Sequence, residues 1–219
     1  MAGPHGAAVT APYSLSVELV AAQTLAYYND RAAEFRDGTR DHDVSHNIAA
    51  LLRHIEVPPP FTILDFGCGP GRDLKVFSGL GHIAIGLDGA ARFADMARAC
   101  SGCDVWQQDF SQLDLPDQHF DGIFANASLF HLPSQALPRM LQALHASLKT
   151  GGVLFSSNPH GRNEEGWSGG RYGAFYDLET WQRHLSGAGF VELTHYYRPE
   201  GVPRRLQPWL ASVWRKPGG

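Results

Sequence analysis

The stretch TILDFGCGPGRDL, residues 62–74, constrains the fold of this chain more than any other segment. An apolar, β-prone run ends there in Asp65 and Phe66, three glycines and a proline follow, and a helical pattern begins directly after them. Glycines at such a turn let a buried strand bend tightly into a helix, and they let a ligand approach the backbone closely. The stretch predicts a strand, turn and helix with a ligand site, and tight packing alone is the alternative for an isolated motif of this kind.

Strand-like and helical patterns alternate after Pro60. The β-prone runs are residues 61–66, 82–88, 104–110, 120–127, 153–158, 190–197 and 209–214, and the helical patterns are 72–79, 90–99, 134–148 and 177–187. Such alternation is typical of parallel strands joined by right-handed crossovers, with helices on both faces. The segment between the last two runs is too poor in helical residues for a crossover, so these runs are expected to pair antiparallel. The predicted α/β fold is a doubly wound sheet of seven strands, mostly parallel with an antiparallel last strand.

Helical patterns over residues 16–35 and 46–55 precede this sheet. The first twelve residues are small and interrupted by Gly and Pro, so residues 1–12 are expected to form a flexible arm. A chain of 219 residues is long enough for one sizeable core. We therefore expect a single domain over residues 13–219, with N-terminal helices at 13–57 and the sheet at 61–216.

Composition excludes several classes of function. Lys and Arg total 18 against 22 Asp and Glu, and no dense basic stripe occurs, which argues against a nucleic-acid partner. Three cysteines, an odd number, favour a reducing compartment, and no further ligands accompany Cys100 and Cys103 to make a metal site. No apolar run approaches the ~20 residues that span a bilayer, and the N-terminus lacks the order of a secretory signal. A cytoplasmic protein without a membrane partner is expected, as a monomer or a homodimer.

Acidic residues end two further predicted strands. Asp88 closes the run IAIGLD, where a carboxylate can accept hydrogen bonds from both hydroxyls of a ribose. Asp109 closes the third run, where it is placed to meet an adenine amino group while Phe110 packs on the ring. Acids at the ends of three successive strands fit one nucleoside lying along the carboxyl edge of the sheet.

At these motifs the chain resembles the class I S-adenosylmethionine-dependent methyltransferases, in the small-molecule branch that includes methyltransferase domains 11 and 25. The motifs LDFGCGPG, GLD, QDF, FANASLFHLP and LKTGGVLF stand in the order and spacing of that family, and the resemblance covers roughly residues 25–216. It implies a Rossmann-like core, N-terminal helices that form a lid over the carboxyl edge, and S-adenosylmethionine as the cofactor, with S-adenosylhomocysteine as its product.

The resemblance also implies which residues hold the cofactor. Asp65 would position its methionine end, the glycine turn would contact it through the backbone, Asp88 would bind the ribose, and an aromatic side chain of the N-terminal helices would close over it. The residues expected in the cofactor site are Asp65, Gly67, Cys68, Gly69, Asp88, Gly89, Asp109, Phe110, Asn126, Ala127, Tyr27 and Phe35.

Candidate residues for the chemistry come from the N-terminal helices and the end of the fourth strand. His131 is a candidate to accept a proton from an acceptor hydroxyl, thiol or amine, and the alternative is a histidine that hydrogen-bonds a loop carbonyl or lines the cofactor pocket. His42 and Tyr28 are further catalytic candidates. The long loop 158–177 is glycine-rich and aromatic, which favours a wall of the acceptor pocket with Arg171 pairing a substrate carboxylate. The expected acceptor-binding residues are Arg40, His46, Asn158, Trp167, Arg171, Tyr172 and Tyr176.

The leading interpretation is an enzyme that moves a methyl group from S-adenosylmethionine to a nitrogen, oxygen or sulfur atom of a small polar metabolite. Carbon methylation stays open, as does a non-catalytic subunit that only binds the cofactor. A nicotinamide-dependent oxidoreductase is a weaker alternative, because the order G-C-G-P-G-R departs from the GxGxxG fingerprint that reaches a pyrophosphate.

Overall fold

The computed structural model describes residues 16–218. The arm expected at residues 1–12 lies outside the described residues. The strands are β1 (Thr62–Phe66), β2 (Ile83–Asp88), β3 (Asp104–Gln107), β4 (Phe120–Asn126), β5 (Leu148–Pro159), β6 (Glu164–Ser168), β7 (Arg171–Phe175), β8 (Val191–Arg198) and β9 (Trp209–Arg215). The α-helices are α1 (Val17–Asp30), α2 (Ala32–Thr39), α3 (Ser45–Leu52), α4 (Arg72–Gly79), α5 (Ala91–Ser101), α6 (Leu137–Ser147) and α7 (Leu178–Gly187). Two short 3-10 helices are η1 (Leu129–His131) and η2 (Arg204–Leu206).

Seven strands form the main sheet in the order β3-β2-β1-β4-β5-β9-β8. The first five strands in this order, from β3 to β5, pair parallel with their neighbours, and β9 pairs antiparallel with both β5 and β8. The central strands are apolar on both faces, and every residue of β4 before Asn126 is buried, as doubly covered parallel strands require. The predicted sheet is confirmed, with the antiparallel strand β9 set one place inside the edge strand β8.

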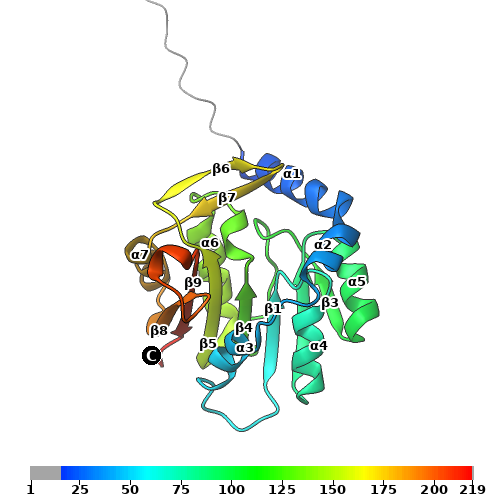
Figure 1. Cartoon of the computed structure of the whole chain (residues 1–219). Coiled ribbons are helices and arrows are strands. Elements are labelled where there is room, and N and C mark those ends of the chain that lie inside the picture. The colour runs from blue at the N-terminus through cyan, green and yellow to red at the C-terminus, as the bar shows by residue number, and fades with distance from the viewer. Residues whose placement is uncertain (1–15, 219) are drawn as a thin grey trace, which may run out of the picture.

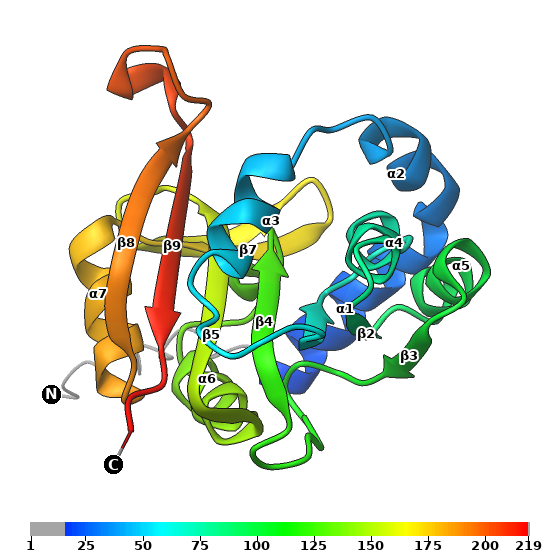
Figure 2. The ribbon, with the colours of Figure 1, turned by 90° about the horizontal axis from the view of Figure 1, so that it is seen from below.

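Helices cover both faces of the sheet (Figure 2), and each face has its own hydrophobic core. On one face, Leu141 and Leu144 of α6 and Trp181 of α7 pack against the strands. On the other face, Leu51 of α3 and Leu74 and Phe77 of α4 pack against them. The two cores fix the strands, so the carboxyl ends of β1, β2 and β4 meet at one edge. Among the described residues, no helix has the length and apolar character needed to cross a membrane.

The structure departs from the predicted elements in two places. The helical pattern at residues 16–35 is two helices, because Arg31 leaves helical geometry with φ −108° and ψ 17°, so three helices precede β1 instead of two. The long loop contains a β-hairpin, β6 and β7, whose turn is Gly169 and Gly170 with φ of +58° and +88°. Two central residues with positive φ match the twist of paired strands, and glycine adopts that geometry without strain.

The hairpin and α1 lie together across the carboxyl edge of the sheet, and we call α1 with the β6–β7 hairpin the roof (Figure 1). The Tyr172 main-chain N–H donates to Thr24 Oγ1 at 3.3 Å. Gly170 lies so close to Tyr27 that a Cβ atom there would be 2.8 Å from the ring. The Glu165 carboxylate accepts from the main-chain N–H and the hydroxyl of Ser134, at 2.7 and 2.9 Å, which ties the hairpin to the segment after η1.

Candidate active site

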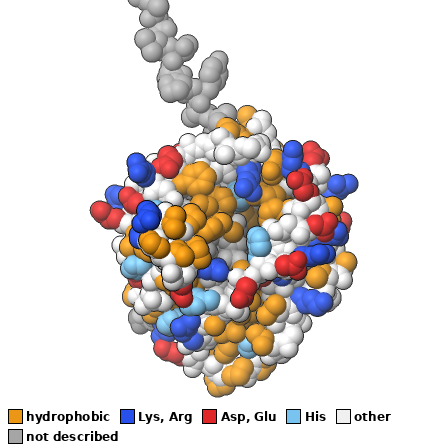
Figure 3. Space-filling view, in the orientation of Figure 1, with side chains coloured by type: hydrophobic (Ala, Val, Ile, Leu, Met, Phe, Trp, Pro, Cys, Tyr) orange, Lys and Arg blue, Asp and Glu red, His pale blue; other side chains and the backbone are white. Residues whose placement is uncertain are grey.

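A cavity of about 780 Å³ lies between the roof and the carboxyl edge of the sheet. In Figure 3 it is visible as a hollow bordered by hydrophobic side chains. Its volume is within the range of cavities that hold a cofactor or a drug-sized ligand. A ligand bound there would contact the turn after β1, the ends of β2 and β4, and both parts of the roof.

The turn between β1 and α4 holds three glycines in left-handed geometry. A Cβ atom at Gly67 would be 2.4 Å from Cβ of Ser128, and one at Gly71 would be 2.7 Å from Cα of Ala97. At Gly69 the nearest atom would be a ring carbon of Phe35 at 3.9 Å, across the cavity. Gly67 and Gly71 are thus required for packing as well as conformation, whereas Gly69 leaves open space for a ligand against the backbone.

Asp88, the last residue of β2, is hydrogen-bonded to this turn through its carboxylate. Its two oxygens accept the main-chain N–H groups of Gly69 at 3.0 Å and Ala90 at 2.9 Å. Burial raises the pKa of Asp88 to about 6, and the backbone donors oppose that shift. Asp88 lines the cavity, so its carboxylate is placed to accept further hydrogen bonds from a ligand.

Asp65 lies behind the cavity, within β1, and is not among the lining residues. Its Oδ2 atom is buried without a hydrogen-bond partner among the described residues. Burial raises the pKa of Asp65 well above its usual range, and the negative charge of Asp73 is the second largest cause of this shift. Asp73 does line the cavity, where the guanidinium of Arg72 holds it in two hydrogen bonds of 2.6 and 2.9 Å.

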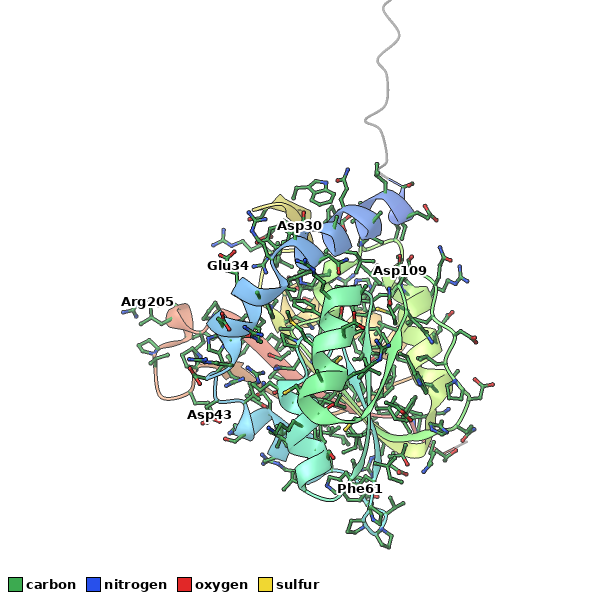
Figure 4. All side chains as sticks on the ribbon, turned by 90° about the vertical axis from the view of Figure 1, so that its right-hand side faces the viewer. Asp30, Glu34, Asp43, Phe61, Asp109 and Arg205 are labelled. Atoms are coloured by element: carbon green, nitrogen blue, oxygen red, sulfur yellow. The ribbon has the colours of Figure 1, made fainter. Side chains whose placement is uncertain are left out.

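Asp109 and Phe110 follow β3 at the same edge. Figure 4 shows Asp109 near α1, at the end of the sheet opposite Phe61. The Asp109 carboxylate accepts from the main-chain N–H and the hydroxyl of Ser111, both at 2.8 Å. The Phe110 ring stacks on Phe66, with centroids 4.3 Å apart, and forms part of the cavity wall.

Tyr28 of α1 and His131 of η1 form a hydrogen-bonded pair across the cavity. The Tyr28 hydroxyl lies 2.7 Å from His131 Nε2, and His131 Nδ1 lies 2.8 Å from the main-chain oxygen of Tyr172. A carbonyl oxygen only accepts, so Nδ1 carries the proton and Nε2 accepts from Tyr28. Burial and, to a lesser extent, the Arg171 charge lower the pKa of His131 to about 4, although the hydrogen bond to Tyr172 opposes the shift, so the imidazole is neutral near pH 7.

Arg171 completes this arrangement from the hairpin. It donates through Nη1 to the Tyr28 oxygen at 3.1 Å. Burial raises the pKa of Tyr28, and the Arg171 charge opposes that shift. One lone pair of the Tyr28 oxygen remains for a third partner, so a proton donor in the cavity can hydrogen-bond the phenol while the phenol donates to His131.

Asn126, at the end of β4, belongs to a chain of polar side chains that leads away from the cavity. Its amide donates to Asp73 at 3.4 Å and accepts from Asn47 of α3 at 3.0 Å. Asn47 is fully buried and accepts from the Tyr196 hydroxyl of β8 at 2.9 Å. This chain fixes the orientation of the Asn126 amide.

The structure brings most of the predicted site residues together. Those that line the cavity are Tyr28, Phe35, His42, Gly67, Cys68, Gly69, Asp88, Asp109, Phe110, Asn126, Ala127, His131, Arg171 and Tyr172. Lining residues that sequence reasoning missed include Thr24, Ser128, Phe130, Phe175, Arg198 and Trp209. Of the aromatic ones, Phe130 follows β4, Phe175 ends the hairpin and Trp209 begins β9, and a position at a strand end is a signal that sequence reasoning could have used.

The remaining predicted residues lie outside the cavity lining. Two of them form ion pairs, Arg40 with Asp41 and His46 with Glu200. Three are aromatic residues in ring contacts: Trp167 packs on Tyr172, Tyr176 stacks on Trp181, and Tyr27 packs against Gly170 and beneath Arg31. Gly89 makes room for Leu25 of α1. Asn158 is buried, and neither polar atom of its side chain has a partner among the described residues. Over residues 16–218 no group of three or more His, Cys, Asp or Glu side chains is arranged to hold a metal ion.

Comparison with known proteins identifies relatives of the chain. The family described as "Methyltransferase domain" matches residues 63–152. The malonyl-[acyl-carrier protein] O-methyltransferase of Yersinia pestis is 28% identical over 201 residues, which cover 87% of this chain and 70% of that enzyme. The trans-aconitate 2-methyltransferase of Azoarcus sp. is 31% identical over 118 residues, 52% of this chain and 45% of that enzyme.

A solved structure resembles the whole fold. The 1,6-didemethyltoxoflavin-N1-methyltransferase of Burkholderia thailandensis, with bound 1,6-didemethyltoxoflavin and S-adenosylhomocysteine, superposes with a TM-score of 0.78 at 23% identity. The match covers 96% of this chain and 94% of that one, so it includes the roof as well as the sheet.

Proposed function

Because the chain belongs to the class I S-adenosylmethionine-dependent methyltransferases, we propose that it transfers a methyl group to a nitrogen, oxygen or sulfur atom of a small molecule bound beneath the roof. The observation that carries this proposal is the pair of Tyr28 and His131 in the cavity wall, with its unprotonated Nε2 atom. One relative is named an O-methyltransferase and one structural neighbour an N1-methyltransferase, which supports oxygen or nitrogen as the acceptor atom.

The residues at the carboxyl edge fit the cofactor. S-Adenosylmethionine supplies an electrophilic methyl group on a sulfonium and leaves as the neutral thioether S-adenosylhomocysteine. Open space over Gly69 admits a ligand against the backbone, and the Asp88 carboxylate retains lone pairs for two ribose hydroxyls. The buried Oδ2 of Asp65 has no partner among the described residues, and a cationic amino group bound near it would favour the ionised form of this carboxyl. Asp109 and Phe110 would bind the adenine.

Tyr28 and His131 would remove the proton that the acceptor loses. The acceptor's proton would move to the Tyr28 oxygen while the phenol's own proton moves to His131 Nε2, so that a neutral tyrosine and an imidazolium result. The Tyr172 carbonyl holds the ring in the required tautomer, and Arg171 stabilises negative charge on the phenol oxygen. Positioning of the acceptor and exclusion of water by the roof would supply the rest of the rate acceleration.

Tyr28→Phe tests this role, because it removes one hydroxyl and keeps the ring that packs on Phe35 and Phe93. A panel of amines, thiols, phenols and carboxylates with methyl-labelled cofactor first identifies an acceptor. We expect the variant to lower kcat by about a hundredfold or more, as loss of general acid–base catalysis does. The Kd for S-adenosylhomocysteine should change by less than about twofold.

Tyr176→Phe is the matched control, since the Tyr176 hydroxyl is buried outside the cavity without a partner among the described residues. It should keep wild-type turnover. An unchanged kcat in Tyr28→Phe would reduce the pair to a structural link between α1 and η1. A panel without labelled product, with intact S-adenosylhomocysteine binding, would favour a non-catalytic subunit. The cytoplasmic location and the oligomeric state stay predictions.

A further inference from the structure

Aromatic rings and prolines form one wall of the cavity, away from the glycine turn. The Phe130 ring lies 6.0 Å from Phe175 and 6.4 Å from Trp209, between centroids. Strand pairing places Trp209 opposite both Pro159 and Arg198. All five residues line the cavity, so this wall suits a flat, apolar ligand body.

Two of the three arginines in the cavity lining have no carboxylate partner. Arg171 donates to the Tyr28 oxygen, and Arg198 donates through Nη2 to the main-chain oxygen of Asp43 at 3.1 Å. Within residues 16–218 neither forms an ion pair within 4.0 Å. A guanidinium offers about five N–H donors, so each of these two retains most of its hydrogen-bonding capacity.

Arg72, the third arginine of the cavity lining, differs from these two because it is paired with a carboxylate. It makes two hydrogen bonds to the Asp73 carboxylate and donates to the Thr39 carbonyl at 2.8 Å. The other acids of the lining form hydrogen bonds with backbone or hydroxyl donors: Asp88 with Gly69 and Ala90, Asp109 with Ser111, and Asp43 with the Ser45 N–H at 2.9 Å. Hydrogen bonding from Ser45 and, to a lesser extent, the Arg198 charge lower the pKa of Asp43, yet no carboxylate among the described residues forms an ion pair with Arg171 or Arg198 within 4.0 Å.

We propose that the methyl acceptor carries a carboxylate on a flat apolar body and is methylated at a separate, protonated nitrogen, oxygen or sulfur atom. Its anionic group binds against Arg171 and Arg198 and its body against Phe130, Phe175 and Trp209. This inference rests on the proposed function and adds the chemical class of the acceptor. The planar fork of arginine matches the two oxygens of a carboxylate, and pairing in a partly buried cavity strengthens the attraction. Half-burial of both arginines makes them more costly to leave unpaired than exposed ones.

Such an acceptor would also prepare the proton-accepting pair. The positive charge of Arg171 lowers the pKa of His131. A carboxylate paired with Arg171 offsets that charge, so binding of the acceptor makes His131 a stronger base. A neutral acceptor leaves Arg171 unpaired and lacks this effect.

The test compares matched acids and amides. Benzoate with benzamide, 2-naphthoate with 2-naphthamide, and indole-3-acetate with indole-3-acetamide are titrated into protein saturated with S-adenosylhomocysteine. We expect at least one acid to bind about tenfold or more tightly than its amide. In Arg198→Gln this preference should fall below about threefold, and Arg171→Lys, which keeps the charge without the fork, should give an intermediate value.

Arg205→Gln is the matched control. Arg205 lies on η2 and points away from the body of the protein (Figure 4), and its replacement should leave the preference unchanged. Amides that bind as tightly as the acids, or acids that do not bind at millimolar concentration, would overturn the inference. The S-adenosylhomocysteine titration that precedes each experiment separates the two proposals: a sample that binds it but rejects the acids contradicts only the acceptor class, whereas a sample that does not bind it contradicts the proposed function.

Discussion

Gly67 and Gly69 stand two residues apart in one turn, yet their surroundings differ. Both have positive φ, +76° and +52°. A side chain at Gly67 would collide with Ser128, whose hydroxyl donates to the Phe66 carbonyl at 2.7 Å, so this glycine serves the fold. A side chain at Gly69 would enter the cavity, so that glycine serves the ligand. The two explanations that the sequence left open for the motif therefore apply to different residues of it.

Gly69→Ala should separate ligand binding from stability. We expect it to cost about 1–2 kcal/mol of unfolding free energy, which is typical of left-handed geometry with a Cβ atom. Its methyl group occupies the space against the backbone, so the Kd for S-adenosylhomocysteine should rise more than about tenfold. Isothermal titration and thermal unfolding measure the two effects.

Gly81→Ala is the control for this prediction, because Gly81 has φ +86° and a Cβ atom added there would have no other atom within 4 Å. It should cost similar stability and keep wild-type affinity. Equal affinities of the two variants would show that the cofactor does not approach Gly69.

For His131, the sequence predicted a place in the site but not its hydrogen-bond partner Tyr28. Its position after the fourth strand made it a candidate, and its bond to the Tyr172 carbonyl matches the alternative of a histidine bonded to a loop carbonyl. Its bond to Tyr28 joins residues 103 positions apart. Such a pairing depends on how α1 lies across the sheet, and no local pattern contains that information.

Among the helices and strands, the roof connects parts of the chain that are distant in sequence. Thr24 and Tyr28 of α1 bond to Tyr172 and Arg171 of β7, and Glu165 of β6 bonds to Ser134. Both parts of the roof line the cavity, so a ligand there touches α1 and the hairpin at once. We expect them to be stabilised together on binding.

Hydrogen exchange measures this coupling. Saturation with S-adenosylhomocysteine should slow amide exchange in residues 17–30 and 164–175 and leave α7 unchanged. Thr24→Val removes the acceptor of the Tyr172 N–H and should speed exchange in both parts of the roof. Thr194→Val is the control, because Thr194 is a half-buried strand residue whose hydroxyl makes no hydrogen bond among the described residues. It should leave amide exchange in the roof unchanged. Protection confined to α1 alone would contradict a roof that responds as one unit.

The strands of the main sheet were predictable because each is a β-prone run set off by helical patterns or turn residues. The hairpin was missed, since five-residue strands such as Glu164–Ser168 carry a weak pattern and an isolated hairpin is only marginally stable without packing. Packing against α1 supplies that stability here. The break at Arg31 was missed for a related reason, because no Gly or Pro marks it.

Across the molecule as a whole, buried acids gather at the carboxyl edge of the sheet. Asp65 and Asp88 have raised pKa values through burial, and that of Asp88 is about 6. An acid whose pKa is raised on folding stabilises the folded state most at low pH, and this contribution is lost as pH rises through the folded value. Near pH 7 the ionised Asp88 therefore costs stability, which a ligand with hydroxyl donors offsets.

Binding of S-adenosylhomocysteine at pH 7 and pH 5, in the wild-type protein and in Asp88→Asn, tests whether a nucleoside cofactor occupies this edge. Hydroxyl donors favour the ionised carboxylate, so with a pKa of about 6 the wild-type Kd should be near micromolar at pH 7 and about tenfold weaker at pH 5. Asp88→Asn should bind more than about tenfold more weakly at pH 7 and lose most of the pH dependence. Wild-type protein that binds NADH but not S-adenosylhomocysteine, or an Asp88→Asn variant with wild-type affinity at both pH values, would contradict a cofactor held by Asp88.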